Sequence, residues 1–531
     1  MIKKYFWIFL TLILILAATL RIVNLDKNPP HLGNDEISIA FDSYSIRTTG
    51  KDEYGVWLPL SFISHRDYKA PLYAYLNIPF NFVFGNNEYG IRMLSVVSSL
   101  VAILIIALLA RFLGGEKLAL LAALLLTINP KNIFVSRMSY ESNLASTLVL
   151  LGVYFIFLFR EKQKQFYLLI SGLFLGFSIW AYHTQKGLVP LLLVVLPWLC
   201  RKEIKLRKWW VLWITTLLII IPIGFDFFNV QIKDPYNRAS SQIWYKSVYI
   251  ENYLKNTNDF LPKRILTVVV DPVYKYFDHF SFDILFTRGM EMFPKNEPLN
   301  FGWFLIFSLP VLIIGLFNLN KIFGKYASWV VCWCLLCPIV PSLTVGEVAS
   351  VRNLAFVIPT ILIMAGGFLI LIKKSKILSI GLTILILINF FLFGIAYYVH
   401  FPKISGDNFQ YGYKQAWTYI KPIVKDYEKI IIEPRFGING QFVGLPRLYL
   451  GYFGAFNAKT MQQRDNKLSK IGKYWIKNID WNEEIIEKKS LYIVSVSNPK
   501  AGNGFGTLEL LTVIRNTNNE VQFLIYKTLE N

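Results

Sequence analysis

Charged residues are scarce in this sequence. Asp, Glu, Lys and Arg make up 17% of its 531 residues, whereas 54% are hydrophobic and the mean hydropathy is +0.43. A soluble domain could not bury so much apolar surface, because too few polar side chains remain to cover it. The scarcity of charge therefore excludes an ordinary soluble protein and indicates a chain that spans a lipid bilayer.

Cysteine is also rare. The four cysteines, Cys200, Cys332, Cys334 and Cys337, all lie within or at the end of apolar runs. Cys334 and Cys337 have CxxC spacing, but neither a second pair nor a histidine cluster accompanies them. We therefore interpret all four as small buried hydrophobic residues and predict no metal site at them.

Acidic residues are outnumbered by basic ones. The sequence has 34 Asp and Glu against 55 Lys and Arg, which gives a formal net charge of +21. In a soluble protein this excess would suggest a nucleic-acid partner. Here the basic residues concentrate in short loops between apolar runs, as the positive-inside rule expects, and no basic face with interleaved aromatic residues is evident. We predict no nucleic-acid partner.

Long apolar runs recur through most of the chain. Their length of roughly 17–25 residues is what a helix needs to cross a hydrocarbon core of about 30 Å. Because the runs are continuous and not alternating, they predict helices and not the strands of a barrel. No small-residue cleavage site follows the first run, so we expect a retained span and not a signal peptide. The sequence predicts about eleven transmembrane helices, at residues 5–23, 90–110, 117–133, 142–159, 166–182, 188–200, 209–226, 301–317, 327–345, 353–372 and 377–398.

The loops between these runs form two alternating sets. One set is short and basic, with residues 160–164 and 201–208 as examples, and the positive-inside rule places it in the cytoplasm. With the N-terminus inside and an odd number of spans, the C-terminus lies outside. We therefore predict a multi-pass protein of the plasma membrane, with extracytoplasmic loops at residues 24–89 and 227–300.

The C-terminal tail has a different pattern from the apolar region. Residues 412–427 have helical periodicity, and three short segments have the composition of strands. The predicted strands are residues 429–433, 490–496 and 520–526. The sequence thus predicts an all-α membrane domain at residues 1–399 and a small soluble extracytoplasmic α/β domain at residues 400–531.

The first outer loop contains two adjacent carboxylates, Asp35 and Glu36. Apolar residues recur at helical spacing from Ile37 to Tyr44, which predicts a short amphipathic helix along the membrane surface. Asn34 would cap this helix. Carboxylates in the first turn of a helix are favoured by its dipole, so they have a structural interpretation as well as a catalytic one.

Other charged residues at the outer boundary also have two interpretations. Lys69 either extends toward lipid headgroups or binds a lipid-linked phosphate. Arg137 and Glu141 are four residues apart and would pair if helical, yet ionisable groups at the membrane boundary are often functional. A lone histidine such as His183 is more often structural than catalytic. Arg352 either anchors a helix at the interface or offers its forked donors to phosphate.

At these residues the sequence resembles the GT-C glycosyltransferases of the protein O-mannosyltransferase and aminoarabinose-transferase superfamily, and most closely the bacterial dolichyl-phosphate-mannose–protein-mannosyltransferase-like branch. The resemblance covers roughly residues 1–400. The matching segments are Asp35-Glu36, Tyr68–Tyr73, Glu88–Arg92, Ser136–Glu141, Tyr182-His183, Tyr276–Ser281 and Pro341–Thr344 with Arg352. The evidence for the resemblance is the order of these segments and their placement on one predicted side of the membrane.

The resemblance implies a GT-C fold and transfer of a sugar from a polyprenyl-phosphate carrier on the outer face. Asp35 would act as general base, because a hydroxyl is a poor nucleophile until a carboxylate accepts its proton. Lys69 and Arg352 would stabilise the charge that builds on the leaving phosphate. The catalytic candidates are Asp35, Glu36 and Glu141, and the substrate-binding candidates are Lys69, Tyr73, Arg92, Arg137, His183 and Arg352.

Departures from the family leave the donor sugar open. Ala70-Pro71 stands where relatives often have two prolines, and Thr184–Gly187 follows His183 with an unexpected sequence. The acceptor also stays open, as a protein hydroxyl, a lipid or a wall polymer.

No WWDYG-like motif is present, which argues against an oligosaccharyltransferase. The resemblance requires no cofactor; Asp35 and Glu36 could hold a divalent metal ion, but no further ligand cluster supports one.

Two other classes of function fit part of the sequence. A transporter or flippase of lipid-linked sugars would place charges within the membrane in broken helices, often with inverted repeats. Here the charges lie at one predicted interface, and no repeat is evident. A non-catalytic cell-envelope assembly protein would depend on its C-terminal domain and would tolerate loss of Asp35.

Overall fold

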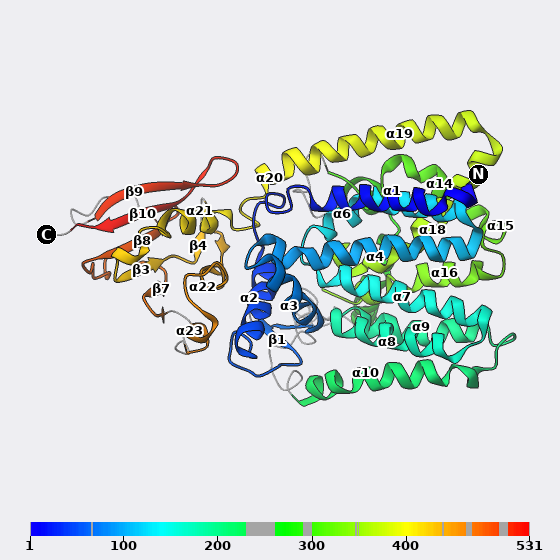
Figure 1. Cartoon of the computed structure of the whole chain (residues 1–531), viewed down its shortest axis with the longest axis horizontal. Helices are drawn as coiled ribbons and strands as arrows, with labels where there is room; N and C mark the ends of the chain where they lie inside the picture. The colour runs from blue at the N-terminus through cyan, green and yellow to red at the C-terminus, as the bar shows by residue number, and fades with distance from the viewer. Residues whose placement is uncertain are drawn as a thin grey trace. The chain divides into compact units, whose positions relative to one another are not determined.

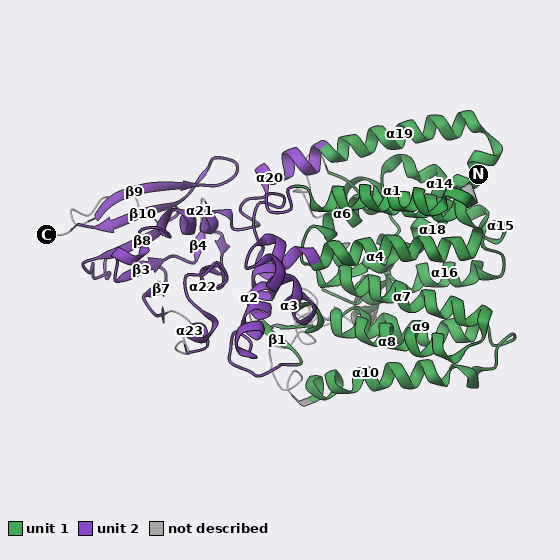
Figure 2. Ribbon diagram, viewed as in Figure 1, with its two compact units in different colours: residues 1–23, 60–73, 94–394 green, residues 24–59, 74–93, 395–531 purple. Residues whose placement is uncertain are grey.

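The computed structural model of the chain describes residues 2–64, 67–229, 261–289, 300–345, 348, 350–437, 440–463, 470–498 and 508–529. Figure 2 shows two compact units. Unit 1 contains residues 1–23, 60–73 and 94–394, and unit 2 contains residues 24–59, 74–93 and 395–531. Most of the predicted first outer loop therefore groups with the C-terminal residues. The division of the chain at residue 399 stays a prediction, and most of the predicted loop 227–300 lies outside the described residues.

Unit 1 consists mainly of helices that run side by side (Figure 1). Helix α7 packs against α8, α8 against α10, and α14 against α18. The helices that lie wholly or mostly in unit 1 are α1 (Ile2–Ile22), α4 (Glu88–Gly114), α5 (Glu116–Thr127), α6 (Pro130–Ser136), α7 (Glu141–Lys162), α8 (Gln165–Ala181), α9 (Gln185–Leu199), α10 (Trp210–Asn229), α13 (Leu261–Asp278), α14 (Leu309–Phe317), α15 (Leu319–Phe323), α16 (Ala327–Leu336), α17 (Ile339–Ser342), α18 (Val357–Lys374) and α19 (Lys376–Ile395). A two-stranded sheet, β1 (Phe62–Ser64) and β2 (Asp67–Lys69), also belongs to this unit.

Among the described residues, seven helices are long and apolar enough to cross a membrane. They are Lys4–Ile22, Glu88–Gly114, Glu141–Lys162, Leu206–Phe228, Leu319–Ser342, Val351–Lys374 and Lys376–Ile404. The bent pair α5 and α6 would make an eighth span, and three shorter apolar helices coincide with further predicted spans. The chain is therefore a multi-pass membrane protein, as predicted, while the count of eleven spans stays a prediction.

Helix α18 forms the core of unit 1. Of its most apolar stretch, 89% is buried, compared with 22% for α19. Glycines let α18 and α14 approach closely: a Cβ added at Gly367 would lie 1.9 Å from the carbonyl oxygen of Val311, and one at Gly315 would lie 2.2 Å from that of Ile363. Small residues at such contacts are typical of helix packing in membranes, where close backbone approach replaces the hydrophobic effect.

The bend between α5 and α6 is held by Arg21, which is fully buried near the end of α1. Its Nε donates to Ser99 Oγ at 2.9 Å, and its Nη2 donates to Asn132 Oδ1 at 2.6 Å. Both Nη atoms donate to the carbonyl of Thr127, the last residue of α5, at 3.3 Å. Carbonyls at a helix C-terminus lack intrahelical donors and form the negative end of its dipole. Arg21 therefore stabilises the 60° break in this span.

In the part of the chain that the structure describes, six strands form a mixed sheet in unit 2. They are β3 (Lys429–Ile432), β6 (Lys470–Ile471), β7 (Tyr474–Ile476), β8 (Ser490–Ser495), β9 (Leu508–Arg515) and β10 (Val521–Thr528). Their order is β6-β7-β3-β8-β10-β9, with β3 parallel to β7 and β8 and the other pairs antiparallel. The predicted small sheet domain at the C-terminus is confirmed, and the three predicted strands correspond to β3, β8 and β10. The strands β4 (Arg435–Phe436) and β5 (Phe442–Val443), which follow β3 in the sequence, form a separate two-stranded sheet.

The helices of unit 2 are α2 (Asn34–Thr49), most of α3 (Leu72–Phe84), α20 (Phe401–Ile404), α21 (Tyr411–Ile420), α22 (Pro446–Tyr452) and α23 (Ala458–Gln462). The predicted helix at residues 412–427 is too long, because α21 ends at Ile420. Pro422 is the physical reason, since proline lacks the backbone N–H that the next intrahelical hydrogen bond needs. Helix α21 packs against β9 and β10.

Replacing Arg21 by methionine removes every one of these donors while keeping an apolar stem. Each buried acceptor left unpaired costs about 1–3 kcal/mol. We expect Arg21→Met to lower the thermal unfolding midpoint of the purified protein, and we expect no change in Arg207→Met, a control at an exposed arginine of the same unit. An unchanged midpoint for Arg21→Met would show that the bend does not depend on this side chain.

Candidate active site

Helix α2 carries the two predicted carboxylates and begins after Gly33. Gly33, and not Asn34 as predicted, is the N-cap residue, and its backbone N–H donates to Glu36 Oε2 at 3.1 Å. This bond is the reciprocal half of a capping box, in which the third helical residue satisfies the N–H of the cap. The backbone N–H of the N-cap residue is therefore satisfied by the Glu36 side chain, which belongs to the helix itself.

The predicted amphipathic character of α2 is wrong. Residues on several of its faces are buried, including Ser38, Ile39 and Asp42. Helices α22 and α23 pack against it. Gln462 of α23 donates to Ser45 Oγ at 3.0 Å. The C-terminal part of unit 2 therefore covers the polar side that the sequence pattern would have left exposed.

Glu36 is held in a two-bond fork by Arg92 of α4. Arg92 Nε donates to Glu36 Oε1 at 3.1 Å, and Nη2 donates to Oε2 at 3.0 Å. The same guanidinium donates to the carbonyls of Leu25, Pro29 and His31, at 2.8, 2.9 and 2.6 Å. Both residues are buried, so each charge is compensated where water cannot reach it. This geometry favours a positioning role for Glu36 and Arg92.

Asp35 differs from its neighbour because it is exposed at the first turn of α2. The residue before it, Asn34, accepts a hydrogen bond from Gln410, and Leu32 accepts one from the hydroxyl of Tyr449. Side chains of the C-terminal region thus fix the backbone that leads into Asp35. Of the two carboxylates, Asp35 is the one that is exposed to solvent.

In unit 1, strand β2 brings Lys69 next to a histidine from a distant part of the sequence. His183 lies in the turn between α8 and α9, and its Nε2 is 2.9 Å from the carbonyl oxygen of Tyr68. Lys69 is only 6% exposed although lysine is almost never fully buried. Tyr73 follows in the first turn of α3 and is fully buried. The structure therefore gathers Lys69 and His183 at one strand.

Arg137 and Glu141 do not share a helix. Arg137 ends α6 as its C-cap residue, and Glu141 begins α7 after a turn. Arg137 is fully buried, and its Nη1 donates to the carbonyl of Leu20 in α1 at 3.1 Å. The condition for a pairing along one helix is therefore not met, because α6 ends before Arg137 and α7 begins at Glu141.

Arg352 lies in a 3₁₀ segment, Ser350–Phe356, that leads into α18. Its Nη1 donates to Thr344 Oγ1 at 2.7 Å and to the carbonyl of Val345 at 2.9 Å. Lys275 of α13 donates to the carbonyl of Thr344 at 3.1 Å. Thr344, at the end of the Pro341–Thr344 segment, therefore accepts hydrogen bonds from two cationic side chains, Arg352 and Lys275. The sequence had indicated only Arg352.

Comparison with known proteins finds one matching family model and several similar structures. Residues 68–225 match the model of the dolichyl-phosphate-mannose-protein mannosyltransferase family. No curated protein matches the chain in sequence. Among solved structures, ArnT from Cupriavidus metallidurans bound to undecaprenyl phosphate superposes with a TM-score of 0.57 over 98% of both chains, at 12% identity. The chain therefore has the fold of ArnT.

Further solved structures are similar to this chain. ArnT from C. metallidurans in the apo state has a TM-score of 0.56 at 13% identity, over 98% of this chain and 97% of that one. The oligosaccharyltransferase AglB from Archaeoglobus fulgidus, in complex with an inhibitory peptide and a dolichol-phosphate, has a TM-score of 0.51 at 13% identity. That alignment covers 74% of this chain and 56% of AglB. At such identities the likeness establishes the fold.

Sequence patterns missed several residues that the structure shows to be important. Arg21 looks like an ordinary residue at the end of a span, and nothing local reveals its partners. Glu88 lies in a matching segment, yet its contacts with His31 and Lys414 join residues that are far apart in sequence. Among the described residues, no group of three or more His, Cys, Asp or Glu side chains could hold a metal ion.

Removal of the Arg92 fork should destabilise unit 2. We expect Arg92→Met to lower the free energy of unfolding by about 3–5 kcal/mol, because a buried carboxylate loses its partner, and so to lower the thermal unfolding midpoint strongly. Arg92→Lys should keep only a small part of the stability that Arg92→Met loses, because an ammonium cannot reproduce the fork to Glu36 or reach three carbonyls together. Full stability of Arg92→Lys, measured by thermal unfolding in the same membrane mimetic, would contradict the role of the fork.

Proposed function

We propose that this protein is a membrane glycosyltransferase that moves a sugar from a polyprenyl-phosphate carrier to an acceptor hydroxyl on the outer face of the membrane. The main supporting observation is the contrast on α2, where Glu36 is buried in the Arg92 fork and Asp35 is exposed. The match to a dolichyl-phosphate-mannose-protein mannosyltransferase model supports the donor class. The fold shared with an ArnT that was crystallised with undecaprenyl phosphate supports it further.

In this proposal Asp35 is the general base. The acceptor oxygen forms a bond to the anomeric carbon while its proton passes to the Asp35 carboxylate. The bond between that carbon and the carrier phosphate breaks, and its electron pair stays on the phosphate oxygen. A carboxylate suits the task because proton removal from a hydroxyl must accompany bond formation. Its exposure at α2 keeps it accessible to an acceptor.

We assign stabilisation of the leaving phosphate to Lys69 and Arg352. A lysine that is 6% exposed is desolvated, which strengthens its attraction for an anion. Arg352 carries a guanidinium whose forked donors match phosphate oxygens. His183 positions the strand of Lys69 through the Tyr68 carbonyl. Glu141 orients the acceptor or Arg137 in this proposal, and Arg137 and Tyr73 bind substrate.

We propose a cytoplasmic N-terminus and an extracytoplasmic unit 2. Contacts between predicted inner loops support this orientation: Arg160 donates to Glu203 Oε1 at 2.8 Å and to the carbonyl of Lys325 at 3.2 Å. Three loops that the positive-inside rule assigns to the cytoplasm therefore meet at one end of unit 1. The proposed acceptor is a hydroxyl of a protein, a lipid or a wall polymer.

A transporter of lipid-linked sugars is the second candidate function. One observation favours it, namely the broken span of α5 and α6 with the buried Arg21 beside it. Broken helices with buried charge mark substrate sites in transporters. However, Arg21 is engaged by Ser99, Asn132 and helix-end carbonyls, which is a structural use of the charge. A transporter would move a labelled polyprenyl-phosphate sugar across liposomes without cleaving it.

Replacing the proposed base should stop the chemistry and leave the fold intact. We expect Asp35→Asn to reduce sugar transfer in proteoliposomes by about 10²–10⁴-fold, the usual contribution of general base catalysis. The assay supplies a radiolabelled polyprenyl-phosphate sugar with cell-envelope acceptors. Asp426→Asn, at an exposed aspartate elsewhere in unit 2, is the matched control. Undiminished turnover by correctly folded Asp35→Asn would remove Asp35 from the base role.

Binding of the donor should depend on Lys69 and Arg352 and should not depend on Asp35. We expect Lys69→Ala and Arg352→Ala each to weaken retention of polyprenyl phosphate, with Asp35→Asn binding it normally. Lys202→Ala, at an exposed lysine of unit 1, is the control. Retention is measured by mass spectrometry of the lipid that copurifies with the protein. Equal retention in both cation variants would exclude them from the phosphate site.

A further inference from the structure

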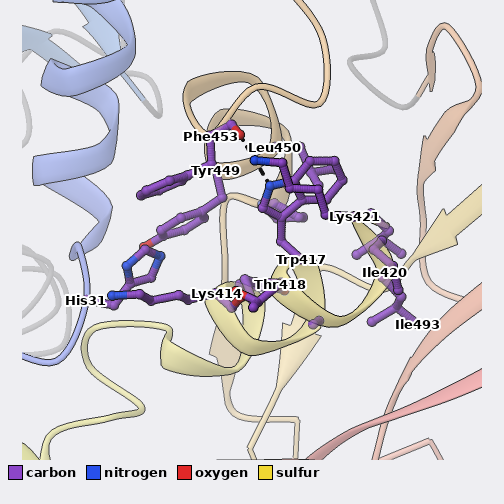
Figure 3. Close-up of a pocket in the computed structure, with 14 residues that line it drawn as sticks. His31, Lys414, Trp417, Thr418, Ile420, Lys421, Tyr449, Leu450, Phe453 and Ile493 are labelled. Atoms are coloured by element: carbon purple, nitrogen blue, oxygen red, sulfur yellow. Dashed lines mark hydrogen bonds between the residues drawn. The ribbon is translucent and has the colours of Figure 1, made fainter. Parts of the chain in front are cut away.

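Unit 2 contains a cavity of about 250 Å³ between α21, α22 and the strands β3 and β8. Figure 3 shows the side chains that surround it. Aromatic residues of α21 and α22 form much of the wall, and His31 contributes from the segment before α2. This volume lies just below the ~300–1,000 Å³ of ordinary small-molecule sites. The cavity therefore suits a single ring better than an extended chain.

His31 is one of the residues that line the cavity, and one polar atom of its ring has no partner among the described residues. Its Nδ1 lies 3.0 Å from Glu88 Oε1, and the Lys414 ammonium donates to the same oxygen at 2.6 Å. Because the carboxylate accepts from both, Nδ1 carries the proton and Nε2 carries a lone pair. In the described part of the chain, Nε2 has no hydrogen-bond partner, although His31 is fully buried. Burial lowers the pKa of His31, which keeps the ring neutral.

The rings around this atom are fixed by their own contacts. The His31 ring lies 4.9 Å from that of Tyr449 and 5.2 Å from that of Phe453, measured between centroids. Trp417 Nε1 donates to the carbonyl of Phe453 at 3.3 Å, which sets the plane of the indole. A wall that is already ordered adds little entropic cost when a ligand binds.

We propose that this cavity is a binding site for one saccharide ring. A sugar ring presents hydroxyl donors, one of which can satisfy His31 Nε2, and C–H faces that pack against aromatic side chains such as Trp417 and Tyr449. Lys421 and Thr418 line the cavity and are exposed, so they stand at its mouth and offer polar contacts to ring substituents. The site is independent of the transfer reaction proposed above, and binding alone tests it.

An isoprenoid or acyl tail fits these observations less well. A tail has no donor, so it would leave the buried Nε2 of His31 unpaired, which is a costly arrangement. Mostly apolar walls with a few placed polar groups are typical of sites that orient a small polar ligand. Occupation by a tail is therefore an alternative that the experiment must separate.

The test is saturation-transfer NMR on the full-length protein in lipid nanodiscs, because glycoside detergents would compete for the cavity. The probes are methyl glycosides of neutral, amino and uronic hexoses. We expect saturable binding of at least one probe. We expect His31→Phe and Trp417→Leu to weaken this binding by about tenfold or more, as the loss of one buried hydrogen bond or one stacking surface implies. His400→Phe and Trp475→Leu, at residues of unit 2 outside the cavity, should leave it unchanged.

A mouth-blocking variant keeps the test decisive if a buried substitution impairs folding. Thr418 is exposed, so Thr418→Trp should close the cavity without disturbing the core, and Lys425→Trp is its exposed control. Loss of probe binding in Thr418→Trp alone supports the proposal. The proposal is overturned if no glycoside binds, if binding survives both Thr418→Trp and His31→Phe, or if the cavity takes geraniol and no sugar.

Discussion

The buried guanidinium of Arg92 is the charge around which the segment before α2 folds. It forms a fork with Glu36 and donates to the carbonyls of Leu25, Pro29 and His31. Arginine suits this position because its five donors can be satisfied in several directions together. An unpaired charge would be too costly to bury, so the carboxylate and the carbonyls must be present for the segment to adopt this path. The exposed position of Asp35 is a consequence of that path.

Side chains of the C-terminal region also hold the segment before α2 in place. Tyr449 and Gln410 bind the backbone and side chain at Leu32 and Asn34, and Lys414 neutralises Glu88 beside His31. These contacts explain why residues 24–59 belong to the same compact unit as the tail. The tail therefore takes part in placing the proposed base, besides forming a sheet of its own. The saccharide cavity lies in the same network, since His31 belongs both to its wall and to the segment that leads into α2.

Hydropathy and strand patterns predicted the parts of the fold that depend on local sequence. Ten of the predicted spans overlap an apolar helix and the eleventh, at 117–133, overlaps the bent pair α5 and α6, because a helix that meets lipid must be apolar along its length. Strands β3, β8 and β10 were recognisable by their β-branched and aromatic residues. The covering of α2 by α22 and α23 was not predictable, since the polar residues that meet there look solvent-exposed when α2 is considered alone. Likewise, the break between Arg137 and Glu141 has no signal as strong as a proline.

For the candidate site, the sequence identified the candidate residues but not which of them are buried in structural contacts and which are exposed. Asp35 and Glu36 are equivalent as sequence, and only the position of Arg92 separates a buried carboxylate from an exposed one. Arg21 and Lys275 gain their roles through partners distant in the chain, at Thr127 and Thr344. Such long-range contacts are decided by tertiary packing, which no local pattern encodes.

The most direct measurement of the central claim is the structure of the full-length protein in a bilayer with a bound polyprenyl phosphate. The account predicts phosphate density within hydrogen-bond distance of the Lys69 ammonium or the Arg352 guanidinium. Phosphate density that contacts neither cation would contradict the assignment of this chain as a transferase that uses such a donor through these residues.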